Sequence, residues 1–403
     1  MERGISLEKA ISIVQLEKKN LSLELIHLDN AYGRVLANSL NSKVNDPRFD
    51  NSAMDGWAVR KEDCTDGKET ILQIVGISQA GNSESILVGP GEACKIMTGA
   101  PIPVGADAIV MIEDSRLSSG KVIISGPARR AYIRQKGENI SKDEQIFSKG
   151  HFMDAASISL AATMGYEYIE VFCKPVVGII STGNELVMPG SDIKESQIYE
   201  SNSFGIAALV EGIGGKPIRY EMVKDSLEEL RNSFNRATEN CDLIITSGGV
   251  SMGDFDIVRK LMELEGEIAF WRIKMRPGGP PLFGKWKKTP LFGLPGNPVS
   301  SHLVFSMLVC PWFTASFHTG KNSKLTLGKE VRVKMLNDVK GAPGKLCLRR
   351  IKITNASEGL VATTHTHQGS GNIHSMVAHN GFTLLPPDID ANIGDIIDAF
   401  WLN

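Results

Sequence analysis

The stretch LIITSGGVSMGDFD (residues 243–256) places a short apolar strand directly before a turn that is rich in glycine and polar residues. Residues 243–246 carry no charged side chain, which is typical of a strand buried on both faces of a sheet. The same order of strand, polar turn and helix recurs between residues 176 and 300. Alternating strands and helices of this length predict a doubly wound α/β domain with a parallel sheet over residues 175–320.

The apolar periodicity also predicts where the elements of this domain lie. We expect strands at 176–181, in a run that ends at 220, and at 243–246, 268–273 and 290–293. We expect helices at 202–211, 226–237 and 257–264, with another after 300. In open α/β sheets, ligands bind beyond the carboxyl ends of the strands. The turns that follow these strands are therefore the first place to look for a site.

The sequence on either side of the α/β domain predicts further domains. The segments 1–43 and 141–174 contain helices, the first of them capped by Ser6, and are expected to form one discontinuous helical and mixed domain. Short strands broken by turns over residues 44–140 predict a β domain inserted between them. Short strands also predominate over residues 321–403, which predicts a small barrel-like β domain.

Composition and charge exclude several classes of function. The 403 residues are 42% hydrophobic, and a net charge of −2 supplies no positive field for nucleic acid or an anionic membrane. The apolar run 303–317 contains Pro311 and is shorter than the ~18 residues of a membrane span. The six cysteines are at least 30 positions apart, which excludes Cys-x-x-Cys sites. We expect buried, reduced, structural thiols in a cytoplasmic protein.

Acidic and basic residues follow the predicted strands of the α/β domain. Glu185, Asp225 and Asp256 come after the first three strands, and carboxylates of this kind hold Mg²⁺ among phosphate oxygens. Glycines in the same turns let the backbone approach a phosphate. Lys274 and Arg276 follow the fourth strand and add positive charge. This pattern predicts a polyanion site with a metal.

Each of these loops, taken alone, also has a simpler explanation. Glycine-rich turns are common between strands and helices, and acidic residues often cap helices. The convergence of several such loops on one edge of the sheet favours the site. The turn is not a Walker A loop, because no Lys-Ser or Lys-Thr follows the glycines, and it is not the dinucleotide-binding fingerprint.

Further motifs occur in a fixed order along the chain. They are NSAMDGWA (51–58), TGAPIPVGADAIVMIE (98–113), GENI (137–140), STGNEL (181–186), SGGVSMGDFD (247–256), RPGGPPLFG (276–284), GLPGNPVS (293–300) and THQGS (366–370). In motif order and spacing the chain resembles, over essentially its whole length, the molybdopterin molybdenumtransferase family of the MoeA and gephyrin E-domain type. Each motif alone is moderately specific, and the ordered set is highly specific.

The resemblance implies an elongated four-domain homodimer that dimerises through the helical domain. It implies a Mg²⁺-dependent enzyme of molybdenum cofactor biosynthesis, which takes adenylylated molybdopterin and molybdate, inserts the metal at the dithiolene and releases AMP. Molybdopterin adenylyltransferase and molybdoenzyme maturation proteins are the expected partners. Molybdate and tungstate are tetrahedral dianions of similar size, and the sequence does not choose between them.

The resemblance also assigns roles to individual residues. Glu185 and Asp256 are expected to bind Mg²⁺, residues 247–256 to cradle phosphate, and Asp55 to complete the cleft from the partner subunit. The catalytic residues implied are Asp55, Glu185, Asp225, Asp256, Lys274 and Arg276. The substrate-binding residues implied are Thr98, Ser247, Gly248, Gly249, Ser251, Gly253, Pro295, Gly296, Asn297, Ser300, Arg350 and Ser370, of which Ser300, Arg350 and Ser370 join Lys274 and Arg276 around molybdate.

Two positions depart from the family pattern. Gly279 stands where many members have Lys, so another cation is needed beside molybdate. Asn139 stands where bacterial members often have Asp, and Glu138 or Asp143 is a candidate to replace that carboxylate. A group of histidines (His365, His367, His374 and His379) is expected to form hydrogen bonds or to contact the cleft, in preference to binding a metal.

Three alternative functions remain open at this point. One is an adenylyltransferase or hydrolase that acts on a pterin or nucleotide and is built on the same sheet, although such an enzyme has no need of the segment 51–58 or of two extra β domains. Another is a paralogue specific for tungsten. The third is a scaffold that binds partner peptides, as the gephyrin type does.

Overall fold

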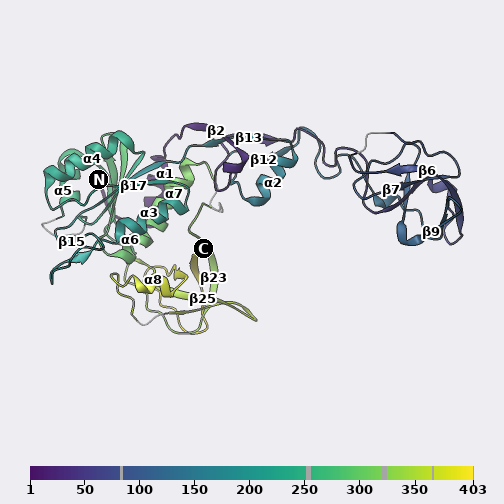
Figure 1. The fold of residues 1–403 in the computed structure, drawn as a ribbon. Coiled ribbons are helices and arrows are strands. Elements are labelled where there is room, and N and C mark those ends of the chain that lie inside the picture. Colours follow the sequence, from purple (N-terminus) through teal and green to yellow (C-terminus); the bar gives the residue numbers. More distant parts are fainter. Residues whose placement is uncertain (82–84, 251–255, 320–324, 365–366, 403) are drawn as a thin grey trace. The chain divides into compact units, whose positions relative to one another are not determined.

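The computed structural model describes residues 1–81, 85–250, 256–319, 325–364 and 367–402 (Figure 1). The chain divides into two compact units. The first comprises Met1–Asn38, Lys149–Asp154 and Ile169–Asn403, and the second comprises Ser39–Ser148 and Ala155–Tyr168. This division does not decide the four domain boundaries predicted from the sequence, which stay a prediction.

A seven-stranded sheet forms the centre of the first unit. Its strands, in spatial order, are β1 (Glu2–Ile5), β19 (Glu267–Ile273), β21 (Leu282–Trp286), β22 (Thr289–Leu294), β18 (Leu243–Ser247), β14 (Val176–Ser181) and β17 (Lys216–Arg219). The strands predicted for the α/β domain are all present within one or two residues of the expected positions. The sheet also contains β1 and β21, which were not predicted.

The expectation of a purely parallel sheet is wrong at one strand. β21 runs antiparallel to both β19 and β22, because the tight connection at Lys287, where φ is +55°, turns the chain straight back into β22. Two reversals restore the original direction, so β19 and β22 point the same way. β22, β18, β14 and β17 are parallel to one another. The carboxyl ends of these strands therefore still share one edge of the sheet.

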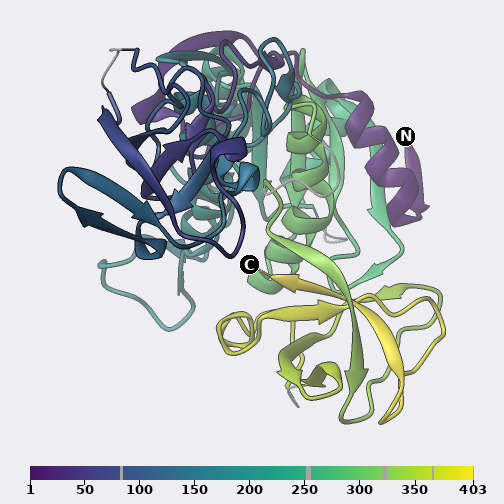
Figure 2. The same ribbon diagram turned by 90° about the vertical axis from the view of Figure 1, so that its right-hand side faces the viewer.

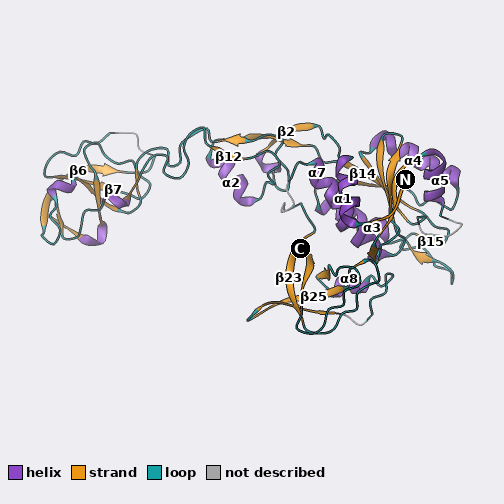
Figure 3. Ribbon diagram, turned by 180° about the vertical axis from the view of Figure 1, so that it is seen from behind, coloured by secondary structure: helices purple, strands orange, loops and turns teal. Residues whose placement is uncertain are grey.

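Helices cover both faces of this sheet (Figure 3). On one face lie α1 (Leu7–Leu16), α3 (Asn202–Gly212), α6 (Pro298–Val304) and α7 (Cys310–Ser316), and on the other lie α4 (Leu227–Asn240) and α5 (Ile257–Glu265). β14 shows why its sequence is almost continuously apolar. Val177 and Ile179 belong to the core under α3, whereas Ile180 belongs to the core under α4 and α5. α1 begins where predicted, with Ser6 Oγ accepting a hydrogen bond from Lys9 N–H.

The helical segment Pro298–Ser316 consists of α6, a π-helical turn (Phe305–Val309) and α7. By length and composition alone, this segment is apolar enough to cross a membrane. However, 78% of its most apolar part is buried inside the protein. A core helix meets the same criterion, and contacts of Leu303, Trp312 and Phe313 with the core account for the apolar sequence.

A closed barrel follows the α/β part of the first unit, as the sequence predicted, and is drawn in yellow-green in Figure 2. Its strands are β23 (Gly328–Met335), β26 (Gly359–Thr364), β25 (Arg350–Ala356), β27 (Gly381–Thr383) and β28 (Ile396–Leu402), with α8 (His374–Ala378) beside them. β20 (Met275–Arg276) pairs in parallel with β24 (Leu346–Cys347) and joins the barrel to the α/β part. The remaining short strands are β2 (Leu23–His27), β15 (Leu186–Val187), β16 (Ile198–Tyr199) and β13 (Tyr168–Phe172), of which β13 starts at the last residue of the second unit and continues in the first.

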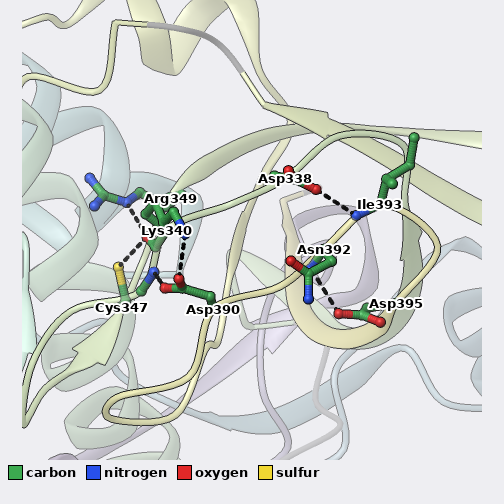
Figure 4. A network of polar contacts seen from close by, with 9 residues as sticks. Asp338, Lys340, Cys347, Arg349, Asp390, Asn392, Ile393 and Asp395 are labelled. Atoms are coloured by element: carbon green, nitrogen blue, oxygen red, sulfur yellow. Dashed lines mark hydrogen bonds and ion pairs between the residues drawn. The ribbon is translucent and has the colours of Figure 1, made fainter.

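Polar contacts fasten the loops at one end of the barrel (Figure 4). The carbonyl of Lys340 accepts hydrogen bonds from Arg349 Nε (3.1 Å) and from Cys347 Sγ (3.7 Å). Lys340 Nζ pairs with Asp390 Oδ2 at 2.7 Å. The charged and sulfur-bearing side chains of this network are all engaged in hydrogen bonds or ion pairs that hold the loops. We therefore assign them a structural role.

The second unit is built around a six-stranded sheet. In spatial order it contains β8 (Ala108–Met111), β5 (Gly56–Val59), β7 (Glu92–Ile96), β6 (Thr70–Ser78), β10 (Lys121–Ile124) and β9 (Ser115–Ser118). Its smaller elements are β3 (Leu40–Asn41), β4 (Asn51–Ser52), β11 (Ile133–Arg134), β12 (Gln145–Phe147) and α2 (Ala155–Thr163), and short 3-10 turns occur in the chain at Leu28–Asn30, Lys61–Asp63, Ile112–Asp114 and Arg130–Tyr132. The short strands predicted within residues 44–140 are present, from β4 to β11.

We predict that Gly284→Ala destabilises the first unit. A Cβ at Gly284 would lie 2.0 Å from the carbonyl oxygen of Glu267, so β21 would have to separate from β19. The expected loss in the free energy of unfolding is at least about 2 kcal/mol, measured by urea denaturation of the whole chain. Gly212→Ala is the matched control, because nothing lies within 4 Å of its Cβ position, in α3. Equal unfolding midpoints for the two variants would contradict the prediction.

Candidate active site

A cavity of about 410 Å³ opens at the carboxyl ends of β14, β18 and β22. It is lined by predicted site residues from four loops: Glu185, Asp225, Ser247, Gly248, Gly249, Asp256, Gly296 and Asn297. Polar residues that the sequence analysis did not name also line it, among them Thr182, Glu200 and Asn202. Ser251 and Gly253 lie outside the described residues.

The turn after β18 approaches the turn after β14 very closely. Gly248 and Gly249 have φ values of +95° and +67°, which favour glycine. A Cβ at Gly248 would lie 2.8 Å from the carbonyl oxygen of Thr182, and one at Gly249 would lie 2.9 Å from Val258 Cγ2. Only glycine at both positions lets the backbone form this wall of the cavity.

Three buried polar atoms from residues that line the cavity have no hydrogen-bond partner among the described residues. They are Thr182 Oγ1, Asn202 Oδ1 and Asp256 Oδ2. Buried polar atoms are almost always paired in folded proteins, so three unpaired ones around one cavity need an explanation. A polar ligand bound in the cavity would supply partners for these atoms.

Asn202 is a structural element of the site that sequence reasoning missed. It is the first residue of α3, and its Nδ2 donates to Ser247 Oγ (2.6 Å) and to the carbonyl of Gly296 (2.7 Å). One side chain therefore ties the loop after β18 to the loop after β22. The sequence predicted that a helix begins at residue 202, but it did not predict the two hydrogen bonds of Asn202.

Glu200 is a buried polar residue of the cavity lining that the sequence analysis did not single out. It is 2% exposed, and its carboxylate accepts hydrogen bonds from Ser181 Oγ (2.9 Å), Ser203 N–H (2.7 Å) and Ser203 Oγ (2.6 Å). These bonds link the end of β14 to the first turn of α3. Glu200 thus supports the wall of the cavity from behind.

The predicted acidic residues reach the cavity from three different loops. Glu185 and Asp225 are exposed, and Asp256 is half-buried. No group of three or more His, Cys, Asp or Glu side chains that could hold a metal by themselves occurs in the part of the chain that the structure describes. Mg²⁺ is commonly held by one or two carboxylates together with substrate phosphates, and this donor set fits that arrangement.

The other predicted residues of the first unit lie outside the lining of this cavity. The carbonyls of Lys274 and Arg276 accept hydrogen bonds from Leu346 N–H (2.9 Å) and Leu348 N–H (2.8 Å) of the barrel. Ser300 is buried in α6, close to the turn at Gly278. These positions place the two cations at the junction between the α/β part and the barrel.

Gly279 and Pro295 occupy tight positions. A Cβ at Gly279 would lie 3.0 Å from the carbonyl oxygen of Met275, so a longer side chain there would press on β20. Pro295 is buried, and its carbonyl accepts a hydrogen bond from Ser301 Oγ. Neither residue contributes a side chain to the cavity.

Ser370 bonds to the α/β part from the barrel side, and Arg350 is the first residue of β25 in the barrel. Ser370 Oγ accepts a hydrogen bond from Asn297 Nδ2 (2.9 Å), and its carbonyl accepts one from Val299 N–H (3.1 Å). Arg350 is 1% exposed. Burial, together with Arg349 nearby, lowers the pKa of its guanidinium below the usual value.

Comparisons with known proteins agree with this arrangement. Residues 5–165 match the MoeA N-terminal region (domain I and II), 178–315 match a probable molybdopterin binding domain, and 332–400 match the MoeA C-terminal region (domain IV). A molybdopterin molybdenumtransferase from Haemophilus influenzae is 37% identical over 72% of this chain and 71% of that protein. Another from Staphylococcus epidermidis is 30% identical over 98% of this chain and 95% of that protein.

The chain belongs to the molybdopterin molybdenumtransferase family. It is therefore an enzyme of molybdenum cofactor biosynthesis that acts on a molybdopterin-related substrate. Two crystal structures of a molybdopterin biosynthesis MoeA protein from Pyrococcus horikoshii have the same fold. They superpose with TM-scores of 0.82 and 0.86 at 30% and 25% identity, over 99% of this chain and 99% and 100% of theirs.

Two further residues implied by the family resemblance, Asp55 and Thr98, lie in the second unit. Asp55 Oδ1 accepts hydrogen bonds from Thr98 N–H (2.7 Å) and Thr98 Oγ1 (3.0 Å). These two bonds, the backbone one first, hold the pKa of the Asp55 carboxyl below its usual value. Asp55 is exposed and therefore presents a charged carboxylate to solvent at neutral pH.

Asn139, which departs from the family pattern, also lies in the second unit. Asn139 Nδ2 donates to Asp46 Oδ2 at 3.1 Å, so a carboxylate stands beside this residue although Asn itself carries none. The Glu138 carboxylate accepts a hydrogen bond from Gln135 N–H (2.8 Å). The replacement of the family Asp by Glu138 or Asp143 stays a prediction.

Hydrogen bonds place two histidines of the predicted group, His367 and His379, in structural surroundings, and the cysteines are unpaired thiols. His379 Nδ1 lies 2.7 Å from the carbonyl of Ser375, and His367 Nδ1 lies 3.0 Å from Asn372 Nδ2; His365 lies outside the described residues. All six cysteines are free. Burial raises the pKa of Cys310 to about 12 and raises those of Cys94, Cys241 and Cys347. Such thiols are poor nucleophiles at neutral pH.

We predict that Thr98→Val raises the pKa of Asp55 part of the way toward its ordinary value. The variant removes the side-chain hydrogen bond to the charged carboxylate and leaves the backbone one in place. The pKa is measured by following the ¹³Cγ resonance of Asp55 in a pH titration. Thr65→Val, in the same unit and away from Asp55, is the control. An unchanged Asp55 titration in Thr98→Val would show that the hydroxyl does not bond there in solution.

Proposed function

We propose that this enzyme inserts molybdenum from molybdate into adenylylated molybdopterin and releases AMP in a Mg²⁺-dependent reaction. The observation that carries the proposal is the cavity at the carboxyl ends of β14, β18 and β22. Its glycine turn, its carboxylates and its three unpaired buried polar atoms suit a phosphate group with a bound cation. Relatives that cover most of the chain are named for this transfer of molybdenum.

Glu185 and Asp256 are the residues that would hold Mg²⁺. Asp256 Oδ2 is buried without a partner among the described residues, which leaves it free for a cation. When bound, Mg²⁺ neutralises the charge that develops on the phosphate of the AMP leaving group. Asp225, in the next loop, adds a third carboxylate to the same cavity.

The protein residues bind and orient both substrates. The turn of Gly248 and Gly249 lets the backbone approach the phosphate, and Asn202 fixes that turn relative to the loop at Gly296. Arg350 and Ser370 approach from the barrel, where a guanidinium and a hydroxyl suit a tetrahedral dianion. No covalent step at a protein nucleophile is needed, in keeping with the raised pKa values of the buried thiols.

We also propose that the enzyme works as a homodimer in the cytoplasm, with molybdopterin adenylyltransferase and molybdoenzyme maturation proteins as partners. The first unit exposes a set of large apolar side chains on α1, β2 and the turn after them, which a second copy would cover. These are Leu16 (83% exposed), Leu23 (47%), Leu25 (69%) and Tyr32 (71%). Large apolar side chains exposed within one short segment of the chain suit an interaction surface.

We predict that Asp256→Ala lowers Mg²⁺-dependent AMP release by about 100-fold or more, because a cation ligand is lost. The assay contains adenylylated molybdopterin, Mg²⁺ and either molybdate or tungstate, so it also measures the choice of metal. Asp192→Ala, an exposed acid outside the cavity lining, is the control and should retain normal activity. Near-normal turnover by Asp256→Ala would place the cation elsewhere. Adenylylation of molybdopterin from ATP, without metal insertion, would favour an adenylyltransferase.

We predict that mixing two inactive variants restores activity if Asp55 serves the partner's cleft. In a heterodimer of Asp55→Ala with Asp256→Ala, one of the two sites then contains both intact residues. After subunit exchange in an equimolar mixture, about one quarter of the wild-type rate is expected. Each variant alone is the control. No recovery, with subunit exchange verified by mass spectrometry, would place both residues in the same subunit's site.

A further inference from the structure

Arg350 is a buried cation that has no carboxylate partner among the described residues. It begins β25 and is 1% exposed. Its Nε donates to Ser375 Oγ at 3.0 Å, and its Nη2 donates to the carbonyl of Gly369 at 3.0 Å. Its Nη1 is buried and has no hydrogen-bond partner in the described part of the chain. Two neutral acceptors thus fix the orientation of the guanidinium and leave one nitrogen unpaired.

Hydrogen bonds also fix the position of Ser375, which contacts Arg350. It is fully buried in α8, and its hydroxyl donates to the carbonyl of Asn372. This donation directs the lone pairs of Ser375 Oγ toward Arg350 Nε. Nδ1 of the buried His379 lies 2.7 Å from the Ser375 carbonyl and secures the same turn.

Gln368 fixes the backbone of Arg350. Its Oε1 accepts a hydrogen bond from Arg350 N–H (3.0 Å), and its Nε2 donates to the Arg350 carbonyl (3.1 Å). The next two residues, Gly369 and Ser370, contact the guanidinium and Asn297 respectively. One short segment therefore positions Arg350 and at the same time touches the rim of the cavity in the α/β part.

We propose that Ser375 and Gln368 are positioning residues for a tetrahedral oxyanion, holding the Arg350 guanidinium so that Nη1 is available to that anion. The inference rests on the proposed function, in which the oxyanion is molybdate. An unpaired buried cation is unfavourable in the free protein, and an anion that pairs with it relieves that cost. Neutral partners suit this purpose, because a carboxylate at Ser375 or Gln368 would pair with the arginine and compete with the anion.

The barrel supplies a matched control for the Gln368 clamp. Asn380 bonds the backbone of the same strand in the same way, with Oδ1 accepting from Ile353 N–H (2.7 Å) and Nδ2 donating to the Ile353 carbonyl (3.0 Å). Gln368 and Asn380 are both half-buried. Loss of either side chain removes two bonds to β25, but only Gln368 bonds to Arg350.

The test compares Ser375→Ala, Gln368→Ala and Asn380→Ala in the full-length protein. Binding of sodium molybdate and of AMP is measured separately by isothermal titration calorimetry, and thermal unfolding is recorded for each variant. We expect the Kd for molybdate to rise about tenfold in Ser375→Ala and Gln368→Ala, because an ordered charged hydrogen-bond donor becomes disordered. The Kd for AMP should remain unchanged. Asn380→Ala should lower the unfolding temperature and leave the molybdate Kd as in the wild type.

Two results would overturn the inference. One is a wild-type molybdate Kd in both Ser375→Ala and Gln368→Ala. The other is an equal loss of molybdate affinity in Asn380→Ala, which would reveal a general effect of weakening β25. Failure of the proposed function gives a different result, namely no molybdate-dependent AMP release by the wild-type enzyme. Steady-state kinetics separates the two further: the inference expects a higher KM for molybdate with little change in kcat.

Discussion

The close approach of two strand-to-helix turns is the constraint on which the site depends. β14 and β18 are parallel neighbours in register from Val177 and Leu243 to Ser181 and Ser247, so their turns leave the sheet side by side. The turn after β18 fits against Thr182 only because Gly248 and Gly249 have no side chain. This contact fixes the backbone that directly follows Ser247 at the end of β18. It also explains why the cavity has a backbone wall on this side, which suits a phosphate.

The parts of the fold that could be predicted from sequence are those with strong local signals. β14 and β18 are almost entirely apolar, and their positions were predicted to within one residue. α4 combines a Ser226 cap with an amphipathic repeat, so its start was predicted to within one residue, although the helix continues three residues beyond the predicted end at residue 237. β21 was missed because it follows the glycine- and proline-rich turn after Arg276 and runs antiparallel among parallel strands. β1 was missed because four residues before a helix carry little pattern, and only pairing with β19 makes them a strand.

The same distinction holds for the site. The positions of the loops could be predicted, since Glu185, Asp225 and Asp256 were expected at one edge of the sheet and do line one cavity. The supporting bonds could not, because they join segments far apart in the chain. Asn202 contacts Gly296 across 94 positions, and Arg350 contacts Ser375 across 25. The unpaired atoms of Asn202 and Arg350 are visible only once the burial of each side chain is known.

The charged residues of the first unit suit the cavity and the surroundings of Arg350 to ligands of opposite charge. Glu185, Asp225 and Asp256 bring three carboxylates to one cavity, yet they do not form a group that could hold a metal by itself among the described residues, so the proposed cation would need substrate phosphate oxygens as further ligands. Arg350 is buried with neutral partners, so an anion is favourable there instead. Asn297 lies between them, lining the cavity and bonding to Ser370. Because the carboxylates come from separate loops and form no closed metal cage, phosphate and cation should bind the cavity more tightly together than either does alone. Such mutual dependence follows from linkage, since each ligand supplies the charge that the other needs.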